Sequence, residues 1–415
     1  MSVKLLMIAF HFPPVASSSG FLRALKFAKY LPEFGIYPSV LTVKPSAYEN
    51  INKANNILLE ELPDIEIIRS AASDAATDFA IKGKYPGFLA FPDRWSSWIP
   101  FGICSGLFHI KQKKIDVIWA TYPIISALVI GYWLKKITGL PLICDLRDPI
   151  WEEETWEDTR KQRWLKSFEF KLLKLADKII FTSPGTIKKY QKRYPNIIDT
   201  KSILITNGYD SDNFKDVNKA QDYKKIFLHS GVIPIYERNP ENFFLALSYL
   251  KKQGVICGNE HEFRLRACGF SSEYQKRTKE LQIDDLVSFP ESISYEEALQ
   301  EMQSADALMI LQDKTCNWQI PAKVFEYMHA QRPILGWVDQ GSDTADVLSS
   351  CNMGEYIAPL SDAMAIADAL SRFIREDAWQ IKCQGYEHFE RKMLASHLAV
   401  IVADLACSNQ ADITV

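Results

Sequence analysis

The chain has 415 residues, of which 47% are hydrophobic and 24% charged, and its 48 lysines and arginines almost balance 51 acidic residues to give a net charge of -3. This length and composition predict a globular protein of about two or three domains, and the near-neutral charge excludes an overall positive field that would hold it on nucleic acid. The eight cysteines form no C-x-x-C pair, which favours reduced thiols in the cytoplasm over a disulfide framework or a metal site.

The first apolar run, residues 5–10, predicts a buried strand rather than a signal peptide. It is short, lacks a small-residue cleavage site and leads into His11-Phe12-Pro13-Pro14. The longest later apolar stretch, residues 124–133, is shorter than the roughly 20 residues of a membrane-spanning helix, and Gly131 interrupts it. We therefore expect a cytoplasmic protein without a transmembrane segment.

The first half of the chain repeats one pattern: a short apolar run, a loop rich in Pro, Gly or Ser, and an amphipathic stretch. This alternation is typical of parallel strands joined by crossover helices. After the first strand it predicts a helix over 20–30 and strands at 39–43, 117–120, 142–145, 178–182 and 202–206.

A polar, lysine-rich passage at 212–225 predicts a linker, after which the same pattern restarts. The expected elements are a strand at 226–231, a helix over 240–253, and strands at 263–267, 286–289, 307–311 and 333–337. The predicted fold class is therefore α/β, with one Rossmann-like domain over residues 1–215 and a second over residues 216–379. Because ligands bind beyond the carboxyl ends of parallel strands, two such domains facing each other predict a ligand cleft between them.

The loop between the first strand and its helix is a candidate anion site. Its sequence, FPPVASSSG, ends at Gly20, where backbone N–H groups and a helix N-terminus can meet a phosphate. The loop has no G-x-G-x-x-G motif, which argues against a dinucleotide-dependent dehydrogenase. An ordinary Pro/Ser turn is the alternative interpretation.

A second candidate lies where the pattern restarts. Gly231 ends a predicted strand, and Arg238 stands at the entrance of the next helix, where a guanidinium can neutralise a diphosphate. A solvated arginine is the alternative.

The segment Asn317-Trp318-Gln319-Ile320-Pro321-Ala322-Lys323-Val324-Phe325-Glu326 is the most informative. We expect Pro321 at the first position of a helix, Lys323 in its first turn and Glu326 one turn later on the same face. A lysine there opposes the helix dipole, which makes sense if an anionic ligand is shared, and Glu326 can accept hydrogen bonds from vicinal ribose hydroxyls. An exposed Lys-Glu pair is the alternative.

Three further segments carry chemistry-bearing residues. Asp145-Leu146-Arg147-Asp148-Pro149 follows a buried strand, so its charges either face the cleft or form an internal ion-pair network. The basic, aromatic stretch 160–175 is either a contact for an anionic membrane or a solvated helix face. The loop 91–98 contains Trp95 and Trp98, which either contact an acceptor or a membrane or pack in the core.

In their order along nearly the whole chain, these motifs resemble the family 4 retaining glycosyltransferases of the GT-B fold, of the bacterial surface-polysaccharide type. The matching blocks are FHFPP with Gly20 and Arg23, YLPEFGIYPSVLTV, DLRDPIW, ITNGYDSDNF, HSGVIPIYERNPENFFLAL and IPAKVFEYMHAQRPIL. The resemblance implies that the apolar, helical pattern near the end of the chain crosses back, so that residues from about 380 to 415 complete the N-terminal, acceptor-binding domain.

The resemblance also implies roles for individual residues. Gly20 and Gly231 are expected close to the donor, Arg238 and Lys323 on its diphosphate, and Glu326 on its ribose. Trp318 stands where the family's E-x7-E motif has its first glutamate, so Asn317 or Gln319 is expected to contact the sugar instead. Further expected positions are Arg147 or Asp148 near the transferred sugar, Glu291, Ser292 and Ile293 at the nucleobase, and His11, Arg23 and Trp95 at the acceptor.

The expected activity is transfer of a sugar, with retention and without a metal or cofactor, from a nucleotide-diphosphate sugar to a glycan or lipid-linked glycan in cell-surface polysaccharide synthesis. The expected partners are this donor and acceptor and, peripherally, the cytoplasmic face of the inner membrane. A nucleotide-sugar epimerase of the same fold and a non-catalytic nucleotide-sugar-binding protein are the alternatives; a phosphorylase would require a lysine pocket for pyridoxal phosphate, of which the sequence gives no sign.

Overall fold

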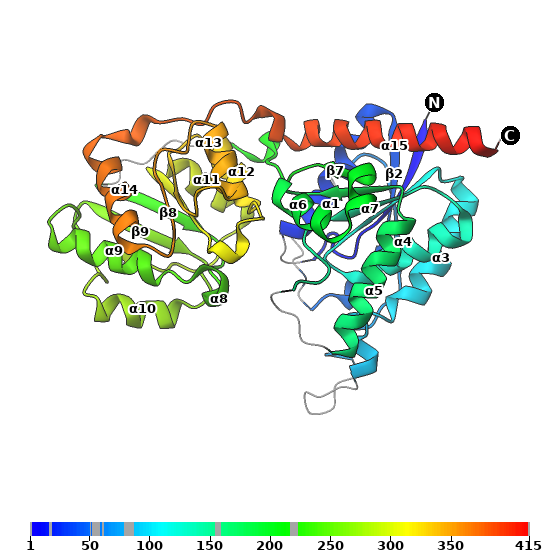
Figure 1. Ribbon diagram of the computed structural model, residues 1–415, viewed down its shortest axis with the longest axis horizontal. Helices are drawn as coiled ribbons and strands as arrows, with labels where there is room; N and C mark the ends of the chain where they lie inside the picture. Colours follow the sequence, from blue (N-terminus) through cyan, green and yellow to red (C-terminus); the bar gives the residue numbers. More distant parts are fainter. Residues whose placement is uncertain are drawn as a thin grey trace. The chain divides into compact units, whose positions relative to one another are not determined.

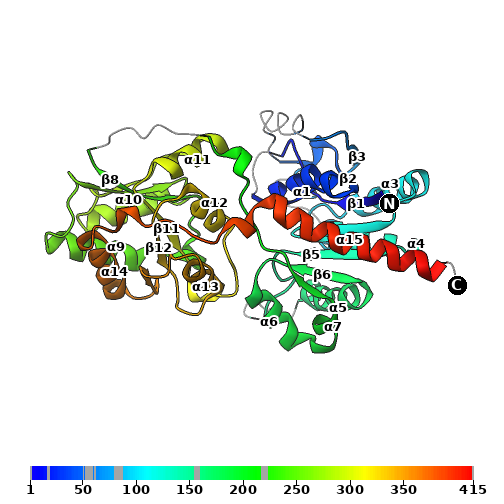
Figure 2. The same ribbon diagram turned by 90° about the horizontal axis from the view of Figure 1, so that it is seen from above.

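The computed structural model describes residues 2–15, 19–49, 51, 59, 62–78, 87–153, 159–215 and 223–413. The chain divides into two compact units (Figures 1 and 2): Met1–Thr206 with Arg391–Val415, and Asn207–Glu390. Residues 16–18 of the candidate anion loop and 216–222 of the expected linker lie outside the described residues.

In the described part of the first unit, seven parallel strands form one sheet in the order β3-β2-β1-β4-β5-β6-β7. They are β1 (Val3–Ile8), β2 (Ile36–Val43), β3 (Glu66–Ser70), β4 (Val117–Thr121), β5 (Leu142–Leu146), β6 (Lys178–Phe181) and β7 (Ser202–Leu204). Every residue of β4 and β5 is buried, as expected for strands covered by helices on both faces. Their continuous apolar sequences therefore predicted them well.

Helices cover both faces of this sheet. They are α1 (Ser19–Tyr30), α3 (Trp98–Lys113), α4 (Ile125–Thr138), α5 (Arg160–Leu175), α6 (Pro184–Arg193) and α7 (Pro195–Lys201). Because crossovers between parallel strands are right-handed, α1 lies on one face and α3, α4, α5 and α6 on the other. Gly131 of α4 is required by packing, since a Cβ there would lie 2.8 Å from the Cβ of Ala120 on β4.

The second unit repeats this architecture. Among its described residues, six parallel strands follow the order β10-β9-β8-β11-β12-β13. The strands are β8 (Lys225–Ser230), β9 (His261–Arg266), β10 (Val287–Ser288), β11 (Ala307–Leu311), β12 (Ile334–Trp337) and β13 (Ile357–Ala358). The helices are α8 (Ile235–Arg238), α9 (Glu241–Lys252), α10 (Ser271–Glu280), α11 (Tyr295–Ser304), α12 (Lys323–Ala330), α13 (Asp343–Ser350) and α14 (Ala363–Arg375).

The last helix, α15 (Arg391–Ile413), belongs to the first unit. It packs against α1 and the 3-10 turn Leu31–Phe34, and its Lys392 Nζ lies 2.6 Å from Glu33 Oε2. The C-terminal helix therefore crosses back to the N-terminal unit, as predicted. It begins later than the apolar pattern near 378, because Asp377 and Gly385 adopt left-handed φ angles of 52° and 69° and interrupt the helix.

The predicted fold class is confirmed: two Rossmann-like units, each built on a parallel sheet, with a C-terminal helix returned to the first. One local prediction is wrong. Helix α12 begins at Lys323, so Pro321 precedes the helix instead of occupying its first position. Among the described residues, no helix is both long and apolar enough to cross a membrane.

Candidate functional site

A glycine at the carboxyl end of β8 allows a lysine to approach the backbone. Gly231 follows the last residue of the strand and has a φ of +111°, which a residue with a side chain rarely adopts. A Cβ at this position would lie 3.0 Å from Nζ of Lys323. Glycine therefore brings the amine directly against the end of the strand, where ligands of parallel sheets bind.

Lys323 is the first residue of α12, and its amine contacts a buried histidine. Its Nζ lies 3.1 Å from Nε2 of His229, whose Nδ1 lies 2.9 Å from the carbonyl oxygen of Met309. A carbonyl only accepts, so Nδ1 carries the proton and Nε2 accepts from the lysine. Burial and the charges of Lys323 and Arg238 hold the pKa of His229 well below its ordinary value, so this histidine is neutral.

The lysine itself is poorly accommodated as a cation. Burial and the nearby charge of Arg238 lower the pKa of Lys323 to about 7, against the opposing effect of Glu326. Its position at a helix N-terminus is also unfavourable for a positive charge. A bound anion would relieve each of these effects, so the surroundings of Lys323 favour an anionic ligand.

Arg238, the last residue of α8, offers a hydrogen-bond donor that is not used within the described residues. Its Nε is buried and has no hydrogen-bond partner there. A buried, unpaired donor of a charged group costs free energy, and its charge acts on both Lys323 and His229. This donor is a second, independent indication of an anionic ligand near Lys323.

Glu326 lies one turn along α12 from Lys323. Its Oε1 accepts a hydrogen bond of 2.8 Å from the hydroxyl of Tyr295 on α11. The next residue, Tyr327, is buried and its hydroxyl accepts from the backbone N–H of Ser230 at 2.8 Å. Tyr327 thus fixes α12 to the end of β8, and Glu326 remains an acceptor suited to vicinal hydroxyls.

The three residues at the place of the first motif glutamate differ in what they can bind. Trp318 donates its indole N–H to Thr315 O at 3.0 Å and has no side-chain acceptor. The backbone oxygen of Gln319 receives Nε2 of Gln312. Asn317 donates Nδ2 to Asp339 at 2.9 Å, while its Oδ1 is buried without a hydrogen-bond partner among the described residues. Asn317 is therefore a candidate for contact with the sugar through Oδ1.

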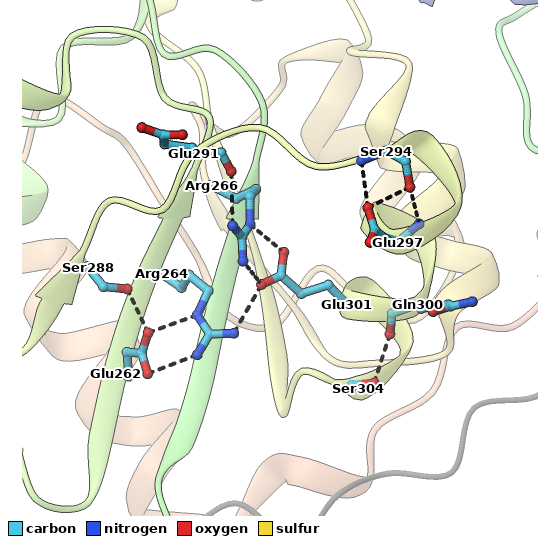
Figure 3. A network of polar contacts seen from close by, with 10 residues as sticks. All are labelled: Glu262, Arg264, Arg266, Ser288, Glu291, Ser294, Glu297, Gln300, Glu301 and Ser304. Atoms are coloured by element: carbon cyan, nitrogen blue, oxygen red, sulfur yellow. Dashed lines mark hydrogen bonds and ion pairs between the residues drawn. The ribbon is translucent and has the colours of Figure 1, made fainter. Parts of the chain in front are cut away.

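The segment Glu291–Ile293 connects β10 to α11 and is anchored on both sides (Figure 3). Arg266 donates from Nη1 to the carbonyl oxygen of Glu291 at 2.9 Å, and Figure 3 shows the carboxylate of Glu291 turned away from it. On the other side, Ser294 caps α11 in a capping box with Glu297.

Behind the segment, Arg266 pairs with Glu301 at 2.6 Å. Ser292 and Ile293 are exposed between the two anchors. The backbone of this segment is thus held in place, with its side chains outside the core. Its role at the nucleobase stays a prediction.

In the first unit, a second cluster of polar residues lies at the carboxyl ends of β1 and β5. Arg147 donates from Nη1 to the carbonyl oxygen of Gly20 at 2.8 Å, which fixes the start of α1 to the end of β5. Burial and Arg147 lower the pKa of His11 to about 4, and Nδ1 of His11 is buried without a hydrogen-bond partner among the described residues. Asp148 is exposed beside them.

Arg23 has a different role from the expected one. It is only 2% exposed, and its Nη2 lies 2.8 Å from Asp145 Oδ1. Its Nη1 donates to the carbonyl oxygen of Thr206 at 2.7 Å and its Nη2 to that of Ile205 at 2.9 Å. The expected contact with an acceptor is therefore wrong for Arg23, which is a buried structural residue. Asp145 belongs to the same internal ion pair, whereas Arg147 and Asp148 lie at the edge of the sheet.

The tryptophan loop is mainly structural. Trp98 is fully buried, which supports the core alternative. Trp95 donates its indole N–H to Ala47 O at 3.2 Å and packs on Phe10 with a centroid distance of 4.5 Å. A role of Trp95 at the acceptor stays a prediction.

The sequence patterns do not single out His229, Tyr295 or Tyr327, which contact Lys323, Glu326 and Ser230 in the structure. His229 lies within the strand predicted at 226–231, and the pattern assigns it no separate role. A histidine next to the carboxyl end of a buried strand, two positions before a glycine, was the available signal.

Comparison with solved structures identifies the fold. The match to sucrose-phosphate synthase from Thermosynechococcus elongatus covers 99% of this chain and 98% of the synthase chain, with a TM-score of 0.64 and 14% identity. HepE from Anabaena, solved with UDP and glucose, matches 99% of each chain with a TM-score of 0.57 and 14% identity. The match to a putative UDP-N-acetylglucosamine 2-epimerase from Listeria monocytogenes covers 97% of this chain and 96% of the epimerase chain, with a TM-score of 0.60 and 10% identity. These similarities show a GT-B fold.

Neither a protein-family model nor a curated protein matches the sequence.

Proposed function

We propose that this protein is a glycosyltransferase that uses a nucleotide-diphosphate sugar as donor and a glycan or lipid-linked glycan as acceptor. The observation that carries the proposal is a pair of basic side chains: Lys323, whose amine lies against Gly231, and Arg238, whose charge acts on Lys323 and whose Nε is buried without a hydrogen-bond partner among the described residues. Both need an anion, and a diphosphate supplies two negative phosphate groups.

The donor would be held by residues of the second unit. Lys323 and Arg238 bind the diphosphate, Glu326 accepts hydrogen bonds from the ribose, Asn317 accepts one from the sugar, and the backbone of Glu291–Ile293 lines the nucleobase. When the sugar leaves, negative charge grows on the diphosphate. The two cations then stabilise the transition state because they are oriented before the reaction.

Metal independence and retention are parts of this proposal. Lys323 and Arg238 can neutralise the leaving group as a divalent cation does in other enzymes, so activity should persist in excess EDTA. For retention, the acceptor attacks the face that the diphosphate leaves, and a phosphate oxygen takes the acceptor proton. Anomeric analysis of the product by NMR tests this stereochemistry.

The acceptor would bind at the edge of the first sheet, beside His11, Arg147 and Asp148. The neutral imidazole of His11 has an unused buried nitrogen among the described residues, which suits a hydroxyl group. A role in cell-surface polysaccharide synthesis, in the manner of family 4 enzymes, rests on the order of the sequence motifs.

We include peripheral membrane association in the proposal, because a lipid-linked acceptor resides in a membrane. The layer formed by α3, α4 and α5 supports this part. Its exposed apolar side chains include Phe101, Phe108, Trp133 and Ile137, and its only carboxylate, Glu169, is buried. Such a layer suits an anionic membrane surface. Flotation with vesicles of phosphatidylglycerol, and with neutral vesicles as control, tests it.

The decisive experiment is incubation of the purified protein with individual nucleotide sugars, with and without lipid-linked glycans, followed by mass spectrometry. Acceptor-dependent sugar transfer is the expected result. Release of free nucleotide and an altered sugar without an acceptor would indicate an epimerase, and donor binding without turnover would indicate a non-catalytic binding protein. Either result would overturn the proposed activity.

A further inference from the structure

The contact between His229 and Lys323 has a defined direction. His229 is 1% exposed and is the last residue but one of β8. Its Nδ1 is held 2.9 Å from the carbonyl oxygen of Met309 on the neighbouring strand β11, which fixes the ring and its tautomer. The lone pair of Nε2 therefore points to Nζ of Lys323 at 3.1 Å.

The other groups around Lys323 do not compete for this position. Arg238 is positively charged, and Glu326 acts on Lys323 through its charge. The hydroxyl of Tyr327 accepts from Ser230 N, and the backbone of Gly231 interacts with His229, where its hydrogen bond opposes the lowering of the histidine's pKa. Within the described part of the chain, Nε2 of His229 is the hydrogen-bond partner of Nζ.

We infer that His229 is the positioning residue of Lys323: by accepting one hydrogen bond it holds the amine against Gly231 and leaves the remaining N–H groups for the diphosphate. A consequence of this arrangement is that nucleotide binding is coupled to uptake of a proton by Lys323. This inference rests on the proposed function and extends it in two ways: it assigns a role to His229, and it couples donor binding to protonation of Lys323. His229 acts through Lys323 and does not itself contact the donor.

The charges around the pair support the coupling. The pKa of Lys323 is lowered to about 7 by burial and by Arg238, so at pH 8 most of the amine is neutral before a ligand binds. A diphosphate between Lys323 and Arg238 favours the charged form of the amine. The pKa of His229 lies well below its ordinary value because of burial, Lys323 and Arg238, so the proton goes to the lysine.

Titration calorimetry with UDP at pH 8, in two buffers of different ionisation enthalpy, measures the proton uptake. The wild-type protein should take up a large fraction of a proton per UDP, and its affinity should fall as the pH rises from 7 to 9. Binding without proton uptake and with constant affinity over this range would overturn the coupling.

Two conservative variants separate positioning from packing. The amide nitrogen of His229→Asn can still donate to Met309 O, but its side chain is too short to reach Lys323, whereas the oxygen of His229→Gln can take the place of Nε2. UDP affinity should fall about tenfold in His229→Asn and stay within about threefold of wild type in His229→Gln. Equal, wild-type behaviour of both would overturn the positioning role.

Two controls complete the design. His261→Gln alters another buried histidine of the same sheet, at the start of β9, and should leave UDP binding and proton uptake unchanged. Nitrogen-15 NMR of labelled histidines tests the contact without nucleotide, because Lys323→Met should shift the Nε2 resonance of His229. If UDP and other nucleoside diphosphates do not bind but this shift occurs, the proposed function fails while the contact stands; without the shift the inference itself is wrong.

Discussion

At the scale of single residues, the candidate donor site is defined by polar groups whose charge or hydrogen-bonding capacity is not balanced among the described residues. Lys323 is a half-buried lysine at a helix N-terminus. Within the described residues, Arg238 has a buried Nε and Asn317 a buried Oδ1 without a hydrogen-bond partner. Buried polar groups in folded proteins are normally paired. Arg238 and Asn317 are two such exceptions among the described residues, and together with the lowered pKa of Lys323 they support the proposal of an anionic, hydroxyl-bearing ligand.

Lys323→Met should therefore stabilise the protein without ligand at pH 6. The native pKa of about 7 lies below the ordinary lysine value of 10.5, so the unfolded state binds more protons between these values and wild-type stability rises with pH across this window. The free-energy cost of burying the charged amine of Lys323 is fully present below pH 7 and disappears above pH 10.5.

We expect Lys323→Met to gain about 1 kcal/mol or more at pH 6, a fraction of the cost of burying a charge, and to lose this advantage as the pH approaches 10. Urea unfolding measures it, and sugar transfer should be lost. A variant that is less stable than wild type at pH 6 would contradict this account of Lys323.

Glu326→Ala should weaken binding of the nucleoside diphosphate. Loss of a charged acceptor for the ribose hydroxyls costs roughly 1.5 to 3 kcal/mol, which corresponds to a tenfold to hundredfold increase in Kd by calorimetry. Tyr295→Phe is the matched control, because it removes only the hydroxyl that donates to Glu326 and should change the affinity much less. Unchanged affinity of Glu326→Ala would remove this residue from the site.

At the scale of elements, the ion pair of Arg23 and Asp145 joins α1 to β5 and, through Ile205 and Thr206, to the chain after β7. Removal of one partner from a buried pair leaves an uncompensated charge and costs about 3 to 5 kcal/mol. We expect this loss for Arg23→Met in urea unfolding. Arg23→Met combined with Asp145→Asn should lose less than the sum of the single variants, and strict additivity would argue against direct coupling.

The sequence predicted elements where their own residues carry the signal. The apolar runs of β4, β5 and β11 identified these strands because both faces of each are buried. By contrast, β3 is a partly exposed edge strand with the sequence EIIRS, and β13 has two residues, so neither contains a distinctive pattern. Helix starts were less certain, as the shift from Pro321 to Lys323 shows.

The site was predictable to the extent that it depends on local sequence. Gly231, Arg238, Lys323 and Glu326 were proposed from their places at strand and helix ends, and their roles at a donor stay predictions. The interaction of His229 with Lys323 joins residues that are distant in the sequence, and single-sequence patterns do not contain such pairings. For the same reason, Arg23 was assigned to an acceptor although Asp145 holds it in the core.

At the scale of the whole molecule, the C-terminal helix is part of the core formed by the N-terminal residues. Leu394, Leu398 and Val402 of α15 are buried in the core of the first unit, whereas Phe389, just before the helix, is buried in the second. A cut after Glu390 therefore removes the helix and leaves the second unit complete. This cut is sharper than one after Asp377, which would also remove Cys383 and Phe389 from the second core.

Truncation after Glu390 should destabilise the first unit selectively. Each of Leu394, Leu398 and Val402 contributes about 1.5 to 3 kcal/mol by burial, so the loss of several kcal/mol approaches the stability of an ordinary domain. Calorimetry should show a lowered first transition, while UDP binding by the second unit persists. A chain ending at Cys407 keeps Ala406, the last buried side chain of the helix among the described residues, and should melt like the full chain. If truncation after Glu390 also leaves the melting profile unchanged, α15 is not part of the first unit's core.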